Sequence, residues 1–367
     1  MATTAPTQFA MPTSNVQPSN VTSVKTLTET ADLKTIPSIY AYTPTNPNEA
    51  DVFEDEVSIP IIDFSLLTSA IPEQRSKAIQ DLDKACQDWG FFMVVNHGVP
   101  ESLLKGIISA SNEFFNLTEE EKKEFAGKNI LDPIRCGTSL STSNGKIFLW
   151  RDFVKLVVQP DQFHAPHKPI GFSEVALEYC NSGRRIVREL LNGISESLGL
   201  DNDYVEKTLN LDSSAQVFSA NLYPPCPQPE LAMGLPPHSD HGLFTLLIQN
   251  DVPGLQVQHN GKWVTINPLP NSFLVNTADQ LEIFSNGKYK TLMHRAILNN
   301  KVARISIAMA NGPSFEATVG PASKLVDSEN HPAAYRPMNY KEYVEQQQLQ
   351  SLGKTILDHV RIEGQSK

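Results

Sequence analysis

One stretch in the second half of the chain places five polar side chains within or directly before short apolar runs, and it limits the possible folds more than any other part. His238 and Asp240 precede the run GLFTLLIQN, and His294 lies inside LMHRAIL. Arg304 and Ser306 lie in ARISIAMA. Apolar runs this short, separated by Gly, Pro and Asn, are typical of the strands of a β-sandwich or barrel.

His238 and Asp240 are spaced so that both can bind one metal ion. In an extended chain, residues i and i+2 point to the same face, so the imidazole and the carboxylate can reach one point. A carboxylate with two imidazoles forms the facial triad that leaves open positions on a non-haem Fe(II). His294 is the best candidate for the third ligand, because it lies in another short apolar run that predicts a strand.

The segment after His294 predicts a β-hairpin. Two strand-like runs are separated by Asn299, Asn300 and Lys301, and asparagine tolerates the positive φ of a tight turn. A three-residue loop would pair His294 with Ser306, on a face that also carries Arg304. Because a guanidinium binds carboxylates through its planar fork, we expect a small dicarboxylate that chelates the metal and meets this arginine.

These motifs resemble those of the plant Fe(II)- and 2-oxoglutarate-dependent dioxygenases. The resemblance extends over roughly residues 58 to 362. Further motifs that carry it are IPIIDF at 59–64, WGFFMVVNHGVP at 89–100, FFNLTEEEKKE at 114–124, NLYPPCPQP at 221–229 and GLQV at 254–257. The family fold is like that of isopenicillin N synthase, so the resemblance implies an α+β protein with a distorted double-stranded β-helix (jelly roll) flanked by helices.

The resemblance also implies how the co-substrate is held. In the family, 2-oxoglutarate occupies two positions on the iron through its keto oxygen and the adjacent carboxylate. Its far carboxylate pairs with Arg304, with Ser306 and Tyr223 as hydrogen-bond partners and Asn221 nearby. We expect no catalytic residues beyond these metal and co-substrate ligands. Dioxygen is the other co-substrate, and ascorbate is expected to support activity.

The family reaction releases succinate and carbon dioxide while a C–H bond of the substrate is hydroxylated. If the oxidised carbon belongs to an O-methyl group, the product collapses to formaldehyde and a demethylated phenol. We expect a small lipophilic plant specialised metabolite as substrate: a flavonoid, an alkaloid, a steroid or triterpenoid, or a coumarin. Two alternatives stay open, namely an iron oxidase of the same fold that does not use 2-oxoglutarate and a catalytically silent homologue that only binds a small molecule.

Three residues are candidates for the substrate pocket. Phe148 and Trp150 lie in a predicted strand and could line the cavity or belong to the core. In related flavonoid oxidases we expect an aromatic residue four positions after the serine of the Arg-x-Ser motif, but this chain has Ala310 there. The substitution predicts a wider cavity that admits a bulkier or non-planar substrate.

The chain divides into three expected parts. Residues 1–57 are predicted to be a leader or linker, although the IPSIY segment within them is expected to pack on the body. Residues 58–200 are expected to form helices and strands that pack on the core, and residues 201–362 to form the jelly roll, the two making one compact unit. Apolar periodicity predicts helices over 72–89, 100–117, 118–125, 172–198 and 339–352.

Composition limits the partners and the compartment. A net charge of −11 and a pI near 5.3 argue against binding to nucleic acid or an anionic membrane. No run of 18 apolar residues predicts a membrane span. The four cysteines are widely spaced, which indicates reduced thiols. We expect a monomeric cytoplasmic protein, with a plastid address as the alternative, because the leader has no apolar signal region and no arginine.

Overall fold

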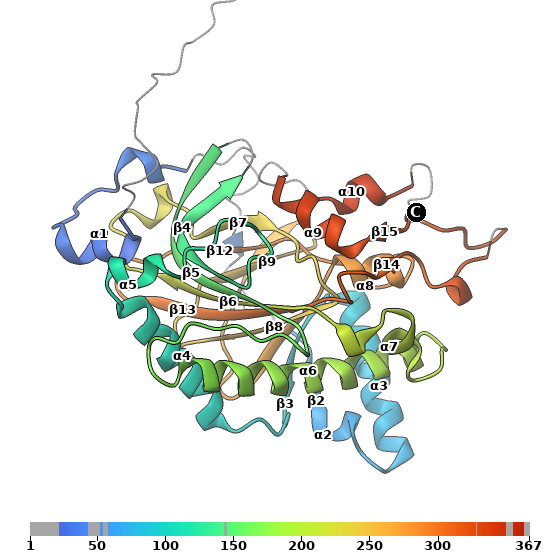
Figure 1. The fold of residues 1–367 in the computed structure, drawn as a ribbon. Helices are drawn as coiled ribbons and strands as arrows, with labels where there is room; N and C mark the ends of the chain where they lie inside the picture. The colour runs from blue at the N-terminus through green and yellow to red at the C-terminus, as the bar shows by residue number, and fades with distance from the viewer. Residues whose placement is uncertain are drawn as a thin grey trace, which may run out of the picture.

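The computed structural model of the chain describes residues 22–42, 52–53, 58–142, 145–327, 329–349 and 355–362. Two β-sheets form the centre of the molecule, with helices around them (Figure 1). This is the predicted α+β jelly roll. Among the described residues, no helix is both long and apolar enough to span a bilayer.

The larger sheet has eight strands. In spatial order they are β2 (Ile61–Asp63), β3 (Phe91–Val95), β11 (Phe273–Thr277), β8 (Phe244–Gln249), β13 (Arg304–Asn311), β6 (Gln216–Tyr223), β5 (Gly145–Val158) and β4 (Ile134–Thr142). The smaller sheet contains, in order, β1 (Val52–Phe53), β10 (Lys262–Ile266), β9 (Leu255–His259), β12 (His294–Ala296) and β7 (Leu235–His238). A separate pair is made by β14 (Thr318–Val319) and β15 (Met338–Asn339).

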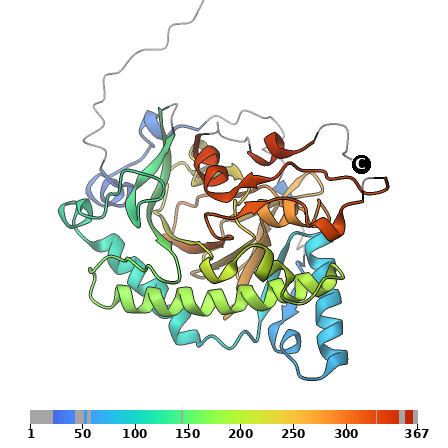
Figure 2. The ribbon, with the colours of Figure 1, turned by 45° about the vertical axis from the view of Figure 1, so that its right-hand side comes forward.

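Helices form at all five predicted apolar periods, and the remaining helices were not predicted. They are α1 (Val24–Thr30), α2 (Phe64–Leu67), α3 (Pro72–Asp88), α4 (Glu101–Asn116), α5 (Glu119–Lys123), α6 (Phe172–Ser197), α7 (Tyr204–Thr208), α8 (Asp279–Phe284), α9 (Tyr340–Leu349) and α10 (Leu357–Val360). Thr118 and Glu121 cap α5 with the predicted capping box. The long helix α6 runs on one side of the sheets, and α9 and α10 lie on the other (Figures 1 and 2).

The large sheet has one face packed on helices. Alternate side chains along β5, β6 and β13, such as Val154, Phe218 and Ile307, are buried in one hydrophobic cluster with side chains of α4 and α6. Because side chains alternate between the two faces of a strand, the residues between them belong to the opposite, inner face. Asn276 of β11 marks this inner face near the predicted metal ligands, since its amide contacts Asp240.

The inner face is filled at one side and open at the other. Strands β3 and β11 pack against β9 and β10 through a small apolar cluster that includes Phe91 and Val257. Toward β5, β6 and β13, the inner-face residues remain partly exposed although their neighbours in sequence are buried. They are Lys155, Val157, Val217, Ser219, Ala308 and Ala310. Accessible space therefore lies against this part of the sheet.

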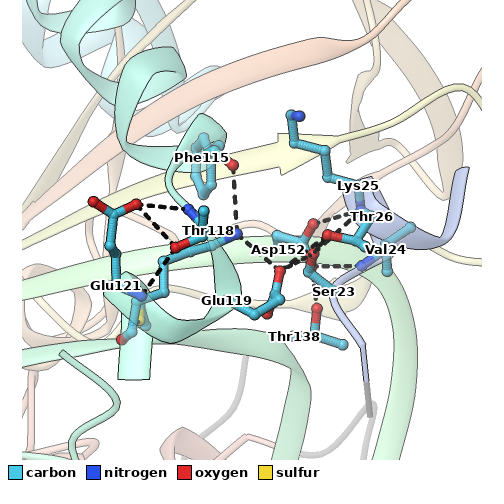
Figure 3. A network of polar contacts seen from close by, with 12 residues as sticks. Ser23, Val24, Lys25, Thr26, Phe115, Thr118, Glu119, Glu121, Thr138 and Asp152 are labelled. Carbon is cyan, nitrogen blue, oxygen red and sulfur yellow. Dashed lines mark hydrogen bonds and ion pairs between the residues drawn. The ribbon is translucent and has the colours of Figure 1, made fainter. Parts of the chain in front are cut away.

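The segment before the fold proper is attached to the outside of β5. Asp152 accepts hydrogen bonds from the backbone amides of Val24 and Lys25 at 2.9 and 2.8 Å, and so caps α1 (Figure 3). Tyr40 is buried, with its ring 5.1 Å from that of Trp150. The prediction that IPSIY packs on the body is confirmed, whereas helix α1 lies in a segment that was predicted to be leader or linker.

The predicted hairpin between His294 and Ser306 is wrong. Strand β12 pairs with β7 and β9 of the small sheet, whereas β13 pairs with β6 and β8 of the large sheet. The side chain of Asn299 accepts hydrogen bonds from two backbone amides of the connection, those of Lys301 and Val302. This turn carries the chain from one sheet to the other, so the two motifs approach each other from facing sheets.

Candidate active site

The structure brings His238, Asp240 and His294 together. His238 ends β7, Asp240 follows in the loop before β8, and His294 begins β12. In the ladder of β7 and β12, His294 lies opposite His238, and their ring centroids are 4.2 Å apart. One ligand atom from each of the three side chains lies within 4.8 Å of the others. The loop residue and the two strand residues can therefore bind one ion.

Neighbouring groups orient the three ligand atoms. The Nδ1 atoms of His238 and His294 lie 2.9 and 3.2 Å from the backbone carbonyls of Pro236 and Leu292, so each Nδ1 donates a proton there. Each Nε2 then keeps its lone pair and lies 3.8 or 3.6 Å from Oδ1 of Asp240. Hydrogen bonds of this kind fix the tautomer of metal-binding histidines.

The side chain of Asn276 completes this arrangement. Its amide nitrogen donates to Oδ2 of Asp240 at 3.0 Å. The other carboxylate oxygen, Oδ1, is thereby left directed at the two imidazoles. An outer hydrogen bond of this type holds a ligating carboxylate in position.

The electrostatics of the three groups suit a divalent cation. Burial, together with the charge of His294, lowers the pKa of His238 to about 3. Burial alone would raise the pKa of Asp240, but the two histidines hold it below its usual range. Burial would lower the pKa of His294, but Asp240 raises it above the ordinary value. The site attracts positive charge, and a metal ion can take the place of the imidazolium proton.

Arg304 is a buried cation without a full set of partners. Only 2 % of the residue is exposed. Its Nη2 donates to Gln249, and its guanidinium lies 5.2 Å from the ring centroid of Tyr223. Nε and Nη1 are buried with no hydrogen-bond partner. Unpaired buried donors are costly, so this group fits a carboxylate that arrives with a ligand.

The other predicted co-substrate residues surround Arg304 on the inner face. In the ladder of β6 and β13, Tyr223 lies opposite Arg304, and Asn221 lies opposite Ser306. Gly254 leaves room for the arginine, since a Cβ there would lie 2.7 Å from the Cδ of Arg304. These contacts place a guanidinium, a hydroxyl and a phenol in one group.

Two of the proposed substrate-pocket residues lie elsewhere. Trp150 is fully buried, and its cluster includes Tyr40 and, at its edge, Phe148. Its Nε1 donates to the carbonyl of Pro224 at 3.0 Å. The alternation of β5 turns Trp150 away from the inner face, so these two aromatic residues contribute to packing. Ala310 does lie on the inner face and is partly exposed.

Two basic residues of β5, Arg151 and Lys155, were not predicted to lie near the site. Arg151 is 3 % exposed and donates to Oδ1 of Asn221 at 3.3 Å. Lys155 lies two positions beyond Phe153, on the same face of the strand. The sequence does contain a signal for them. Arg151 and Lys155 lie four residues apart on one face of an apolar strand, and two cations on the same face need a polar environment.

The C-terminal part of the chain supports the loop that carries Asp240. His241 lies 2.9 Å from the hydroxyl of Tyr340, measured from Nδ1. Tyr343 donates to buried Asp279 at 2.8 Å, and Asp279 also accepts from Ser239 at 3.2 Å. Helix α9 is thus fixed to the residues on either side of the carboxylate ligand.

Comparison with known proteins agrees with this geometry. Residues 214–313 match the 2OG-Fe(II) oxygenase superfamily, and residues 59–174 match the N-terminal region described as non-haem dioxygenase in morphine synthesis. The chain belongs to the Fe(II)- and 2-oxoglutarate-dependent oxygenases. It is therefore an oxidoreductase that uses iron and 2-oxoglutarate.

Several curated plant proteins are similar along most of their length. 2-Oxoglutarate-dependent dioxygenase 19 of Oryza sativa subsp. japonica is 44% identical over 83% of this chain and 90% of its own. Protein DMR6-LIKE OXYGENASE 2 of Arabidopsis thaliana is 40% identical over 84% and 91%. Thebaine 6-O-demethylase of Papaver somniferum is 36% identical over 90% and 93%.

A solved structure shows the same fold. JOX2 in complex with 2OG, Fe and JA superimposes with a TM-score of 0.83 at 30% identity, covering 94% of this chain and 99% of that one. Its crystal therefore holds both the iron and the co-substrate that the family uses.

Proposed function

We propose that the protein hydroxylates or oxidatively O-demethylates a small lipophilic plant specialised metabolite. In hydroxylation, the substrate, dioxygen and 2-oxoglutarate give the alcohol, succinate and carbon dioxide. In O-demethylation, the oxygen enters the methyl group, and the resulting hemiacetal breaks down to formaldehyde and the free hydroxyl. Flavonoids, alkaloids, steroids or triterpenoids, and coumarins are the candidate substrate classes.

The iron ligands in this proposal are His238, Asp240 and His294. The observation that carries the proposal is the convergence of their ligand atoms within 4.8 Å of one another. Two neutral imidazoles and one carboxylate leave open positions on ferrous iron, as oxygenases of this kind require. When bound, the iron and 2-oxoglutarate supply the oxidising chemistry, and the protein supplies orientation and shielding.

The co-substrate carboxylate is proposed to meet Arg304. The unpartnered Nε and Nη1 of this buried side chain supply two donors in a planar fork. Ser306 and Tyr223 add hydroxyl groups at the same end, and Asn221 lies beside them. Because these groups are buried, water is excluded and their hydrogen bonds to an anion are strengthened.

Two observations support a lipophilic substrate. The partly exposed inner-face positions are mainly small or apolar, among them Val157, Val217 and Ala310. Relatives of the chain include thebaine 6-O-demethylase and flavanone 3-dioxygenase 2, whose names describe plant metabolites as substrates. The alanine at position 310 supports a wide cavity, as proposed from the sequence.

The proposal is tested by a screen of purified protein with Fe(II), ascorbate and 2-oxoglutarate. Metabolites of the four classes are added singly, and succinate release and product mass are measured. We expect at least one product heavier by one oxygen or lighter by one methylene, formed with one equivalent of succinate. If 2-oxoglutarate were not consumed under any condition, the proposed function would be wrong.

A further inference from the structure

Three basic side chains gather on the inner face of β4 and β5. Arg151 and Lys155 flank Phe153 at alternate positions of β5, and Phe153 lies opposite Asn221. Arg135 of β4 lies directly opposite Lys155. Like charges opposite each other in a sheet destabilise it, so this arrangement has a cost that a bound anion would remove.

The three cations form no direct ion pair within the part of the chain that the structure describes, although carboxylates lie near enough to interact with them over a longer distance. The Nε atoms of Arg135 and Arg151 are buried without a hydrogen bond. The Nζ of Lys155 lies 5.8 Å from the ring centroid of Phe153. Burial and the charges of Arg151 and Arg135 lower the pKa of Lys155 to about 7.

The nearest carboxylates are occupied elsewhere. Asp152 lies between Arg151 and Phe153 in sequence but faces the other side of β5, where it holds the start of α1 (Figure 3). Asp132 accepts hydrogen bonds from the backbone amides of Lys128 and Asn129 at 2.6 and 2.7 Å. Neither acid forms a direct ion pair with the three cations, although Asp132 and Asp152 interact with Arg135 and Arg151 over a longer distance.

The iron and 2-oxoglutarate do not neutralise these cations either. Ferrous iron carries two positive charges and Arg304 carries one. Asp240 carries one negative charge and 2-oxoglutarate carries two, so the positive and negative charges of these groups are equal. Arg135, Arg151 and Lys155 remain as an excess of positive charge beside a neutral assembly. An enclosed excess of charge favours a ligand of opposite sign.

The position of Lys155 suits binding of the substrate rather than of a second co-substrate. Its partly exposed side chain lies in the same row of the sheet as Ser219 and Ala308, within the open part of the inner face. It is close enough to Asp240 for the two charges to interact. An anion at this lysine would place its apolar remainder beside the metal ligands and Ala308.

We propose that the substrate is a small hydrophobic carboxylic acid whose carboxylate is bound by Lys155 and Arg135, with Arg151 adding positive charge beside them. The inference rests on the proposed function and makes it narrower, because it predicts acids instead of neutral metabolites. The carboxylate acts as an anchor and is not itself oxidised.

The test compares hydrophobic monocarboxylic acids with their methyl esters. Binding is measured by the thermal stabilisation of the protein loaded with Ni(II) and 2-oxoglutarate, so that no turnover is needed. For wild type, we expect at least one acid to bind about 10- to 100-fold more tightly than its ester, as for a charge-assisted hydrogen bond. If no acid stabilises the wild-type complex more than its ester, the proposal is wrong.

Variants locate the anchor. Lys155→Met should weaken binding of the acid about tenfold or more and leave binding of the ester within twofold, and Lys155→Arg should restore the preference for the acid. Lys77→Met serves as a matched control, because Lys77 is exposed on α3 and pairs with Asp81. An acid preference that persists in Lys155→Met would overturn the assignment.

A separate measurement distinguishes this inference from the proposed function. Release of succinate without substrate depends on iron and 2-oxoglutarate but not on a bound substrate. We expect this uncoupled reaction at equal rates in wild type and in the Lys77→Met control. Its absence from wild type would contradict the proposed function, whereas its presence without any acid preference would contradict only the inference about the substrate.

Discussion

Replacement of Arg304 by methionine should separate binding of 2-oxoglutarate from the stability of the fold. In the ligand-free protein, Nε and Nη1 of this side chain are buried and unpartnered. Each such donor costs roughly 1–3 kcal/mol. Methionine removes that cost but also removes the contact with Tyr223, worth about 1–2 kcal/mol, and a hydrogen bond to Gln249. The two effects nearly cancel, so the free energy of unfolding of the ligand-free variant should stay within about 2 kcal/mol of wild type.

The response to 2-oxoglutarate should change much more. At a concentration 100 times its Kd, a ligand stabilises the folded state by about 2.7 kcal/mol. For a fold of about 300 residues this raises Tm by about 4 °C. Loss of two charge-assisted hydrogen bonds, at about 1.5–3 kcal/mol each, weakens binding by about 100-fold or more. The rise in Tm that 2-oxoglutarate causes should then fall below about 1 °C for Arg304→Met.

The assay is thermal unfolding of protein loaded with Ni(II), with and without 2-oxoglutarate. Arg184→Met is the matched control, because Arg184 is a part-buried arginine of α6 that donates to Ser214 and Gln216, away from the inner face. The control should keep the full shift, and Ni(II) binding should be equal in all three proteins. A full shift in Arg304→Met, or a large loss of stability without ligand, would refute the assignment of this arginine to the co-substrate.

Three further predictions concern the metal, the pH dependence and the cavity. Asn276→Leu removes the hydrogen bond to Asp240 and should weaken Fe(II) binding about 10- to 100-fold. The affinity is measured by competition with a chelator, and an unchanged affinity would contradict the proposed role of the Asn276 amide. The pKa of Lys155 is about 7 in the folded protein and 10.5 as the reference value, so the unfolded chain binds more protons between these pH values and the stability contribution of this group rises with pH. Lys155→Met should therefore stabilise the metal-free protein by about 2 kcal/mol at pH 6.5, after allowance for solvent around the side chain. Chemical unfolding should show that this gain in stability vanishes near pH 10.5. A gain in stability that is independent of pH would contradict the lowered pKa of Lys155. Ala310→Phe should lower kcat/KM for the true substrate at least about tenfold by filling the cavity, and unchanged turnover would remove the hypothesis of a wide cavity.

The sequence alone determined the parts that depend on residue type and short spacing. The identities of His238, Asp240 and His294 predict a metal site, and the Arg-x-Ser motif predicts a site for an anion. Apolar periods and the capping box at Thr118 located the helices, because these signals act within a few turns of the chain. The family motifs added the jelly-roll fold and the co-substrate.

Tertiary structure decided how the strands meet. The residues around Asn299 predict a hairpin, because local propensity does not reveal which strands pair across long separations. In the structure, the strands on either side of this turn belong to different sheets. The tertiary structure also decided which face of β5 is covered by other elements. Once α4 and α6 cover one face of the large sheet and α1 packs at Asp152, Trp150 is buried outside, and Arg151 and Lys155 are left facing the space beside the metal ligands.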